Sequence, residues 1–168
     1  MRVNRAAFFL SLFLFFLSPI YFPRLKLLFF APYLILVMYK MDFFSLLVRA
    51  SFAGIIMDLF SAHSFFGLSS LLHLFTAMIV YTMRLNFFED KLTTLPIMTF
   101  IFSVLFSLLE LFFYPLLGGS ISINFRWILS DLFCMPFADA ILALFVFSLP
   151  FQLTKALSKM FRTRRCRR

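Results

Sequence analysis

A few acidic residues and a histidine, set among apolar residues, are the side chains best able to do chemistry in this 168-residue chain. Gly54, Asp58 and Ser61 lie at positions i, i+4 and i+7, so a helix places them on one face. Gly67 follows after a short gap. A carboxylate inside a lipid-embedded segment costs about 3 kcal/mol on insertion scales, so Asp58 must face protein, water or a partner. Because glycine admits a neighbouring backbone and polar groups bond across helices, this stripe indicates a helix-packing face.

Five further polar residues interrupt or flank the apolar runs and form a candidate intramembrane polar cluster. With the orientation derived below, most of them fall in the outer leaflet, at the level of Asp58. Two interpretations stay open: a polar cavity or partner-docking cluster that opens outward, or acids that are each satisfied locally within the bundle. The five are His73, Glu110, Arg126, Asp131 and Asp139, of which the last lies nearer the middle of its span.

No catalytic or cofactor pattern accompanies these residues. The chain has no serine–histidine–acid order with supporting glycines and no phosphate-binding loop, and His63 and His73 have no third metal ligand in view. Cys134 lies in an apolar run and Cys166 in a basic tail, so a disulfide between them is implausible. We therefore expect a protein that is not an enzyme and needs no cofactor or metal.

The composition predicts an integral membrane protein. Hydrophobic residues make up 63% of the chain and charged residues only 14%, whereas a soluble domain averages about 25% charged. The apolar runs are continuous, which favours helices over a barrel. We expect an all-α fold, a polytopic membrane bundle of about six transmembrane helices in one domain (1–154), followed by a basic cytoplasmic tail (155–168). The expected spans are Ala6–Phe22, Leu27–Met41, Phe43–Ser61, Phe65–Met83, Leu92–Leu117 and Trp127–Pro150.

Pro32 interrupts the second of these segments, which is marginal in length for a full crossing, so a kinked or partly re-entrant segment is the alternative. Orientation follows from the basic residues. With an even number of spans, twelve lysines and arginines lie on the side of the termini and three on the other, which predicts that both termini are cytoplasmic. Arg49 lies inside the third span, from which its side chain can reach back to the interface.

The basic tail carries much of the net charge of +9. Anionic lipid attracts such a segment by about 1 kcal/mol per basic residue, so we interpret it as a lipid and topology anchor. A docking site for a cytoplasmic protein is the alternative, and nucleic-acid binding is not expected. The tail residues are Lys155, Lys159, Arg162, Arg164, Arg165, Arg167 and Arg168.

The run from Ala53 to Ser61, followed by Phe66-Gly67-Leu68, resembles the signature of the bacterial rod shape-determining MreD family. That family carries a G-x-x-x-D-x-x-S run, a short gap and a glycine. The chain is also similar in length, in its basic termini, in the acid of the fifth span, Glu110, and in Pro136-Phe137-Ala138-Asp139, although the family more often carries asparagine where this chain has Asp139.

The resemblance implies a multi-pass inner-membrane scaffold of the cell-wall elongation complex, the elongasome, which acts in the regulation of cell shape and peptidoglycan synthesis. It implies three partners: an MreC-type one-span protein, an MreB-type filament protein and a RodA-type glycosyltransferase complex. It also implies an architecture similar to the substrate-binding subunits of energy-coupling-factor transporters.

A substrate-binding membrane subunit of an energy-coupling-factor vitamin transporter is the alternative function, because fold alone does not separate the two. Such a subunit needs an outward ligand cavity and a surface for its coupling subunit, often of small-xxx-small type. The first span carries no Ala-x-x-x-Ala pattern, which favours the scaffold. A proton-linked carrier that uses Asp58 and Glu110 has less support, because no inverted repeat is visible.

Overall fold

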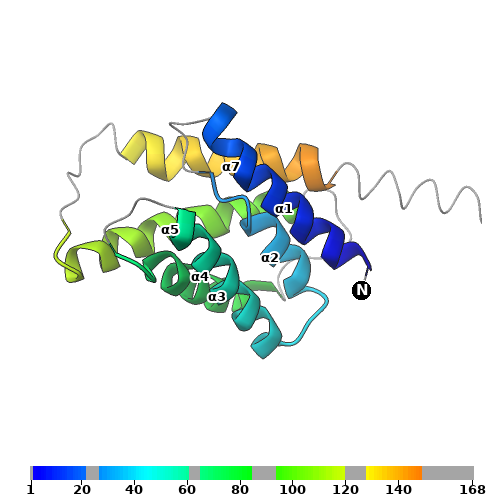
Figure 1. The fold of residues 1–168 in the computed structure, drawn as a ribbon, viewed down its shortest axis with the longest axis horizontal. Coiled ribbons are helices and arrows are strands. Elements are labelled where there is room, and N and C mark those ends of the chain that lie inside the picture. The colour runs from blue at the N-terminus through cyan, green and yellow to red at the C-terminus, as the bar shows by residue number, and fades with distance from the viewer. Residues whose placement is uncertain (1, 22–26, 61–64, 85–93, 120–127, 149–168) are drawn as a thin grey trace, which may run out of the picture.

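The computed structural model describes residues 2–21, 27–60, 65–84, 94–119 and 128–148, with side chains of the first segment described for 6–17. Within these residues every regular element is helical, as Figure 1 shows. A last helix, Ile128–Ser148, has an α-helical centre, α7, between two π-helical stretches, η2 and η3. The elements are α1 Arg2–Tyr21, α2 Ala31–Met38, α3 Phe43–Phe60, α4 Leu68–Met83, α5 Thr94–Leu116, η2 Ile128–Cys134, α7 Met135–Leu142 and η3 Ala143–Ser148.

Three helices of the described chain are long and apolar enough to cross a membrane. They are Phe43–Phe60, Thr94–Leu116 and Ile128–Ser148, while Ala6–Leu17 and Leu68–Met83 are shorter apolar helices. The expected all-α class is therefore confirmed in its coarse form, and the expected six crossings are not established.

The second expected span, Leu27–Met41, contains a much shorter helix than its apolar length suggests. Its helix α2 has eight residues, which is about 12 Å against roughly 30 Å of bilayer hydrocarbon. Pro32 lies at the start of α2, and the four residues before the helix, Leu27 to Phe30, are buried without forming a helix. The interruption at Pro32 is thus the beginning of the helix, because proline fits the first helical turn but breaks an interior one.

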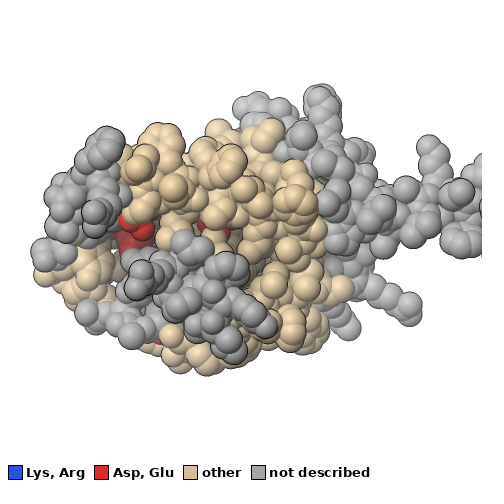
Figure 2. Space-filling model, turned by 90° about the horizontal axis from the view of Figure 1, so that it is seen from above, with Lys and Arg blue, Asp and Glu red and all other residues tan. Residues whose placement is uncertain are grey.

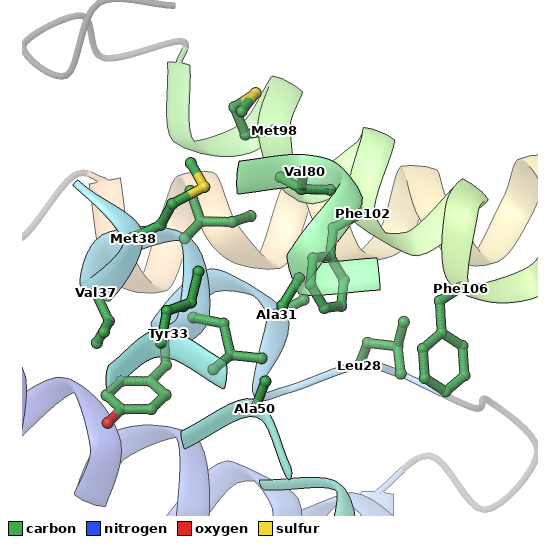
Figure 3. Close-up of a cluster of buried hydrophobic side chains, with 14 of the residues drawn as sticks. Leu28, Ala31, Tyr33, Val37, Met38, Ala50, Val80, Met98, Phe102 and Phe106 are labelled. Carbon is green, nitrogen blue, oxygen red and sulfur yellow. The ribbon is translucent and has the colours of Figure 1, made fainter. Parts of the chain in front are cut away.

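The core is built around α2. Seven of its eight residues are buried, so α2 has no solvent or lipid face. Figure 1 shows it between α1 and α3, and its side chains also meet those of α5 in the core. Figure 3 shows Leu28, Ala31 and Met38 with Ala50 of α3, Val80 of α4 and Phe102 of α5, among the other residues of this cluster.

Helices α3 and α4 form an antiparallel pair, the most extensive helix packing in the described chain. The Phe43 and Tyr81 rings meet at one end, 4.9 Å apart, and Asp58 meets Ser69 at the other end. Helix α5 packs on α4 and α2 and carries the last helix on its other side. This arrangement places the buried acids at the joints between helices.

Candidate functional site

Asp58 lies at the joint between α3 and the start of α4. The backbone N–H of Ser69 donates to Oδ1 over 3.0 Å, and that of Ser70 donates to Oδ2 over 3.1 Å. Both N–H groups belong to the first turn of α4, where a helix has no internal acceptors for them. Asp58 is only 6% exposed, so water cannot take this role. The carboxylate therefore caps α4 from a neighbouring helix and complements the positive end of its dipole.

Gly54 brings the two backbones close enough for this cap. A Cβ built on Gly54 would lie 2.6 Å from Ser70 N and 2.7 Å from Ser69 O, distances that real Cβ atoms do not reach. The Ser70 hydroxyl adds a bond to the Ser51 carbonyl oxygen, 3.1 Å away. Gly54 and Asp58 thus act as a pair: the glycine sets the distance, and the acid one turn later satisfies the donors.

Gly67 is the residue directly before α4. Its φ is 94°, a left-handed conformation that glycine adopts without strain, and a Cβ there would meet no atom within 4 Å. Gly67 is therefore required by its backbone angle and not by close packing. Ser61, the third member of the predicted stripe, lies outside the described residues.

His73 is one turn into α4 and is fully buried. Its Nδ1 lies 2.8 Å from the Ser69 carbonyl oxygen, so Nδ1 carries the proton and donates. The imidazole packs edge-on against the Phe106 ring of α5, with centroids 4.9 Å apart. Its Nε2 has no hydrogen-bond partner among the described residues. Asp58 and His73 thus meet through Ser69, which donates to the first and accepts from the second.

Asp139 lies at the centre of the last helix and forms a second carboxylate joint. The backbone N–H of Leu28 donates to Oδ1 over 3.0 Å, and the Ser103 hydroxyl of α5 donates to Oδ2 over 2.5 Å. The acid is 2% exposed. It therefore ties α5 and the last helix to the non-helical lead into α2.

The position of Asp139 shows why the chain needs an acid there. Asp139 comes eleven residues after Ile128 and nine before Ser148, so it marks the middle of an apolar helix. Leu28 lies at the same level, where an unsatisfied N–H costs several kcal/mol in lipid. At the other end of α2, Arg84 Nη1 donates to the Met38 carbonyl oxygen over 3.1 Å. Asp139 thus lies at the amino-terminal end of α2 and Arg84 at its carboxyl-terminal end, which matches the polarity of the helix dipole.

Two further members of the predicted cluster lie on neighbouring helices, Glu110 on α5 and Asp131 on the last helix. Asp131 is half-buried in the first turn of the last helix, its Oδ2 accepts a bond from the Ser130 hydroxyl over 2.7 Å, and its carbonyl oxygen accepts one from Ser107 of α5. Glu110 is also half-buried, one turn beyond Ser107. Arg126 and the seven basic residues of the tail lie outside the described residues.

Hydrogen bonds connect some members of the predicted cluster, and the grouping of the five in one leaflet stays a prediction. Figure 2 shows acidic side chains only as small areas recessed in a surface that is otherwise uncharged where it is described. Asp58 and His73 share Ser69 as a partner, Asp131 lies on the last helix and Glu110 on α5, and Asp139 bonds to Leu28 and Ser103. Among the described residues, no group of three or more His, Cys, Asp and Glu side chains could hold a metal ion.

Comparison with known proteins gives no relative: no family model, no curated protein and no solved structure matches this chain.

Sequence reasoning missed the partners of the acids. Four partner groups are backbone or hydroxyl groups: the N–H groups of Leu28, Ser69 and Ser70, and the hydroxyl of Ser103. Backbone N–H groups occur at almost every residue, so the sequence does not indicate which of them bond to an acid. Ser103 could have been predicted as a partner, because Ser103 and Ser107 lie four residues apart in an apolar span and form a polar stripe on α5.

We expect Asp139→Ala to destabilise the protein by about 2 kcal/mol, because it leaves the buried Leu28 N–H without an acceptor. Asp139→Asn keeps an acceptor for Leu28 and should cost less. Ser103→Ala should cost about 1 kcal/mol. The stabilities of these variants can be ranked by unfolding the purified proteins in detergent and monitoring the loss of their helical circular dichroism signal. An asparagine variant less stable than the alanine variant contradicts the assignment.

Proposed function

We propose that this protein is a multi-pass scaffold of the bacterial inner membrane that acts in cell-wall elongation, with both termini in the cytoplasm. In this proposal it regulates cell shape and peptidoglycan synthesis by binding an MreC-type one-span protein, an MreB-type filament protein and a RodA-type glycosyltransferase complex. The support is the G-x-x-x-D run and its resemblance to the MreD family, together with an architecture whose polar groups are used within the bundle.

The single observation that carries a binding role, as opposed to transport, is the small volume of the cavity at the centre of the described core. The cavity between α2, α3, α4 and α5 has a volume of about 10 Å³ and is lined by apolar side chains, including Leu34, Ala77 and Phe102. A small-molecule site needs roughly 300–1,000 Å³. This cavity is thus too small to hold a vitamin, which supports a protein whose partners bind on its outside.

The last helix offers the outer face that such a scaffold needs. It is the least buried of the three long helices, and four large side chains at four-residue spacing lie on its exposed side. These are Phe133, Phe137, Ile141 and Phe145. In the proposed function this stripe packs against a partner helix where one is bound and against lipid elsewhere.

The test is recovery of the partner. Tagged protein, solubilised from its own bacterium, should co-purify with a one-span protein that has a coiled coil and an external β domain. A photo-crosslinking residue at Phe137 should capture that partner, and one at the buried Phe102 should not. Depletion should turn rod-shaped cells round. The scaffold is contradicted if depleted cells keep their rod shape and the tagged protein recovers no such partner.

A vitamin-transporter subunit is the alternative. The observation that favours it is α2, a short helix that follows four buried, non-helical residues. Half-length helices with their ends inside the membrane are common at transporter binding sites. In that case the purified protein should bring down a pair of ATPases, and a panel of water-soluble vitamins should contain one that raises its melting temperature. Neither result is expected for the scaffold.

A further inference from the structure

Arg49 is a charged side chain within a candidate membrane span, and it takes no part in the buried joints at Asp58 and Asp139. It is the seventh residue of α3, about 9 Å along the helix from Phe43. It is half-buried, between the core residues Leu46 and Ala50 and the exposed Val48. A guanidinium stays charged at any relevant pH, so this position holds a permanent positive charge.

The partner of Arg49 in the structure is neutral. Nη1 lies 3.3 Å from the Tyr33 hydroxyl of α2, a long hydrogen bond. Within the described residues no carboxylate lies in salt-bridge range of Arg49, and Asp42 at the start of α3 does not reach it. A guanidinium has five N–H donors. One weak bond to a phenol therefore leaves both the charge and most of the donors to a group from outside the described chain.

Tyr33 of α2 lies between Arg49 of α3 and Phe8 of α1. Helices α1 and α3 each pack on α2 and meet directly through rings near their other ends, where Phe16 and Phe60 are 5.0 Å apart. At the level of Arg49 the two are separated by Tyr33, whose ring touches Phe8 of α1. In Figure 3 the Tyr33 hydroxyl lies at the edge of the core cluster, away from Phe102 and Phe106.

We propose that Arg49 forms a binding site for the phosphate of an anionic phospholipid, beside Tyr33 and near the amino-terminal end of α3. The exposed apolar side chains of Phe44 and Val48, on α3 near Arg49, contact the acyl chains. The guanidinium binds the phosphate oxygens by a charge-assisted, bidentate contact. A depth of about 9 Å is within reach of a headgroup, because an arginine side chain extends toward the interface. The site does not depend on the cell-wall role and stands if that role fails.

The experiment uses the full chain in nanodiscs made of phosphatidylcholine alone or mixed with phosphatidylglycerol. Native mass spectrometry after release should show phosphatidylglycerol retained on the wild-type protein in preference to phosphatidylcholine. Arg49→Gln should weaken this retention tenfold or more, as expected for loss of a charged hydrogen-bond donor. Lys40→Gln, which removes a basic side chain from the turn between α2 and α3, is the matched control and should leave retention unchanged.

Two further variants keep the result decisive if Arg49→Gln does not fold. Arg49→Lys keeps the positive charge but loses the planar guanidinium that binds phosphate bidentately. This variant should retain the lipid several-fold more weakly than wild type. Tyr33→Phe should change retention less than twofold, because the arginine carries the contact. Equal retention by Arg49→Lys and wild type overturns the bidentate site. If inorganic phosphate alone competes with the lipid, or a co-purified acidic protein displaces it, then Arg49 binds another ligand and the proposal is overturned.

Discussion

Replacing Gly54 by alanine is expected to unfold the α3–α4 pair. The added methyl group would lie 2.6 Å from Ser70 N and 2.7 Å from Ser69 O, and both neighbours are backbone atoms that cannot rotate away. Overpacking of a fitted core costs about 1–3 kcal/mol, and a clash with backbone belongs at the upper end of that range or above. We expect a loss of about 3 kcal/mol and a fall in melting temperature of roughly 6–12 °C.

Gly119→Ala is the matched control. A methyl group there also meets atoms at very short range, but they belong to the Tyr114 ring, a side chain that can move. Its cost should be clearly smaller than that of Gly54→Ala in the same thermal unfolding assay. If both substitutions cost the same, the close approach of α3 and α4 is not the reason for a glycine at position 54.

Asp58→Ala is expected to destabilise the protein by a similar amount, about 3 kcal/mol, for a different reason. The change leaves the N–H groups of Ser69 and Ser70 buried without an acceptor, and each such group costs about 1–3 kcal/mol. Asp58→Asn retains one acceptor oxygen and should fall between the alanine variant and the wild type. Removal of the charge makes insertion easier, so the variant should still reach the membrane.

The same variants separate a folding role of Asp58 from a partner role. If Asp58 acts by capping α4, partner recovery should fall in proportion to the melting temperature across the alanine and asparagine variants. Combining Gly54→Ala with Asp58→Ala should cost less than the sum of the two, because both act on Ser69 and Ser70. A fully stable Asp58→Ala that has lost its partner would instead place the acid at a docking surface.

The sequence predicted the helical class and the packing stripe because both rest on local spacing. Gly54 and Asp58 share a helix face whatever the tertiary structure, and a glycine one turn before an acid in an apolar run is typical of a close contact between helices. Helix α3 begins at the expected Phe43, whereas α4 begins at Leu68, three residues after the expected Phe65. Hydropathy alone, however, could not show that Leu27–Met41 holds an eight-residue helix, because a buried half-helix and a short span have the same composition.

The grouping of the acids depended on information that the sequence does not carry. Counting basic residues put Asp58, Asp131 and Glu110 in one leaflet, but their separation depends on how α4 and α5 pack. Asp139 bonds to Leu28, 111 residues away, and no periodicity predicts a bond between a carboxylate and a distant backbone N–H. The sequence showed that acids in apolar runs need partners, but it did not show which groups those partners are.

The shape of α2 bears on how the chain is made. At about 12 Å, α2 alone cannot cross the hydrocarbon of a bilayer. Its core neighbours on α5, and Asp139 that satisfies Leu28, are synthesised later than α2 itself. The segment must therefore wait, incompletely folded, until the last helix arrives. Truncated chains that end before residue 128 should leave this segment open to protease, which makes synthesis of the last helix the step that closes the bundle.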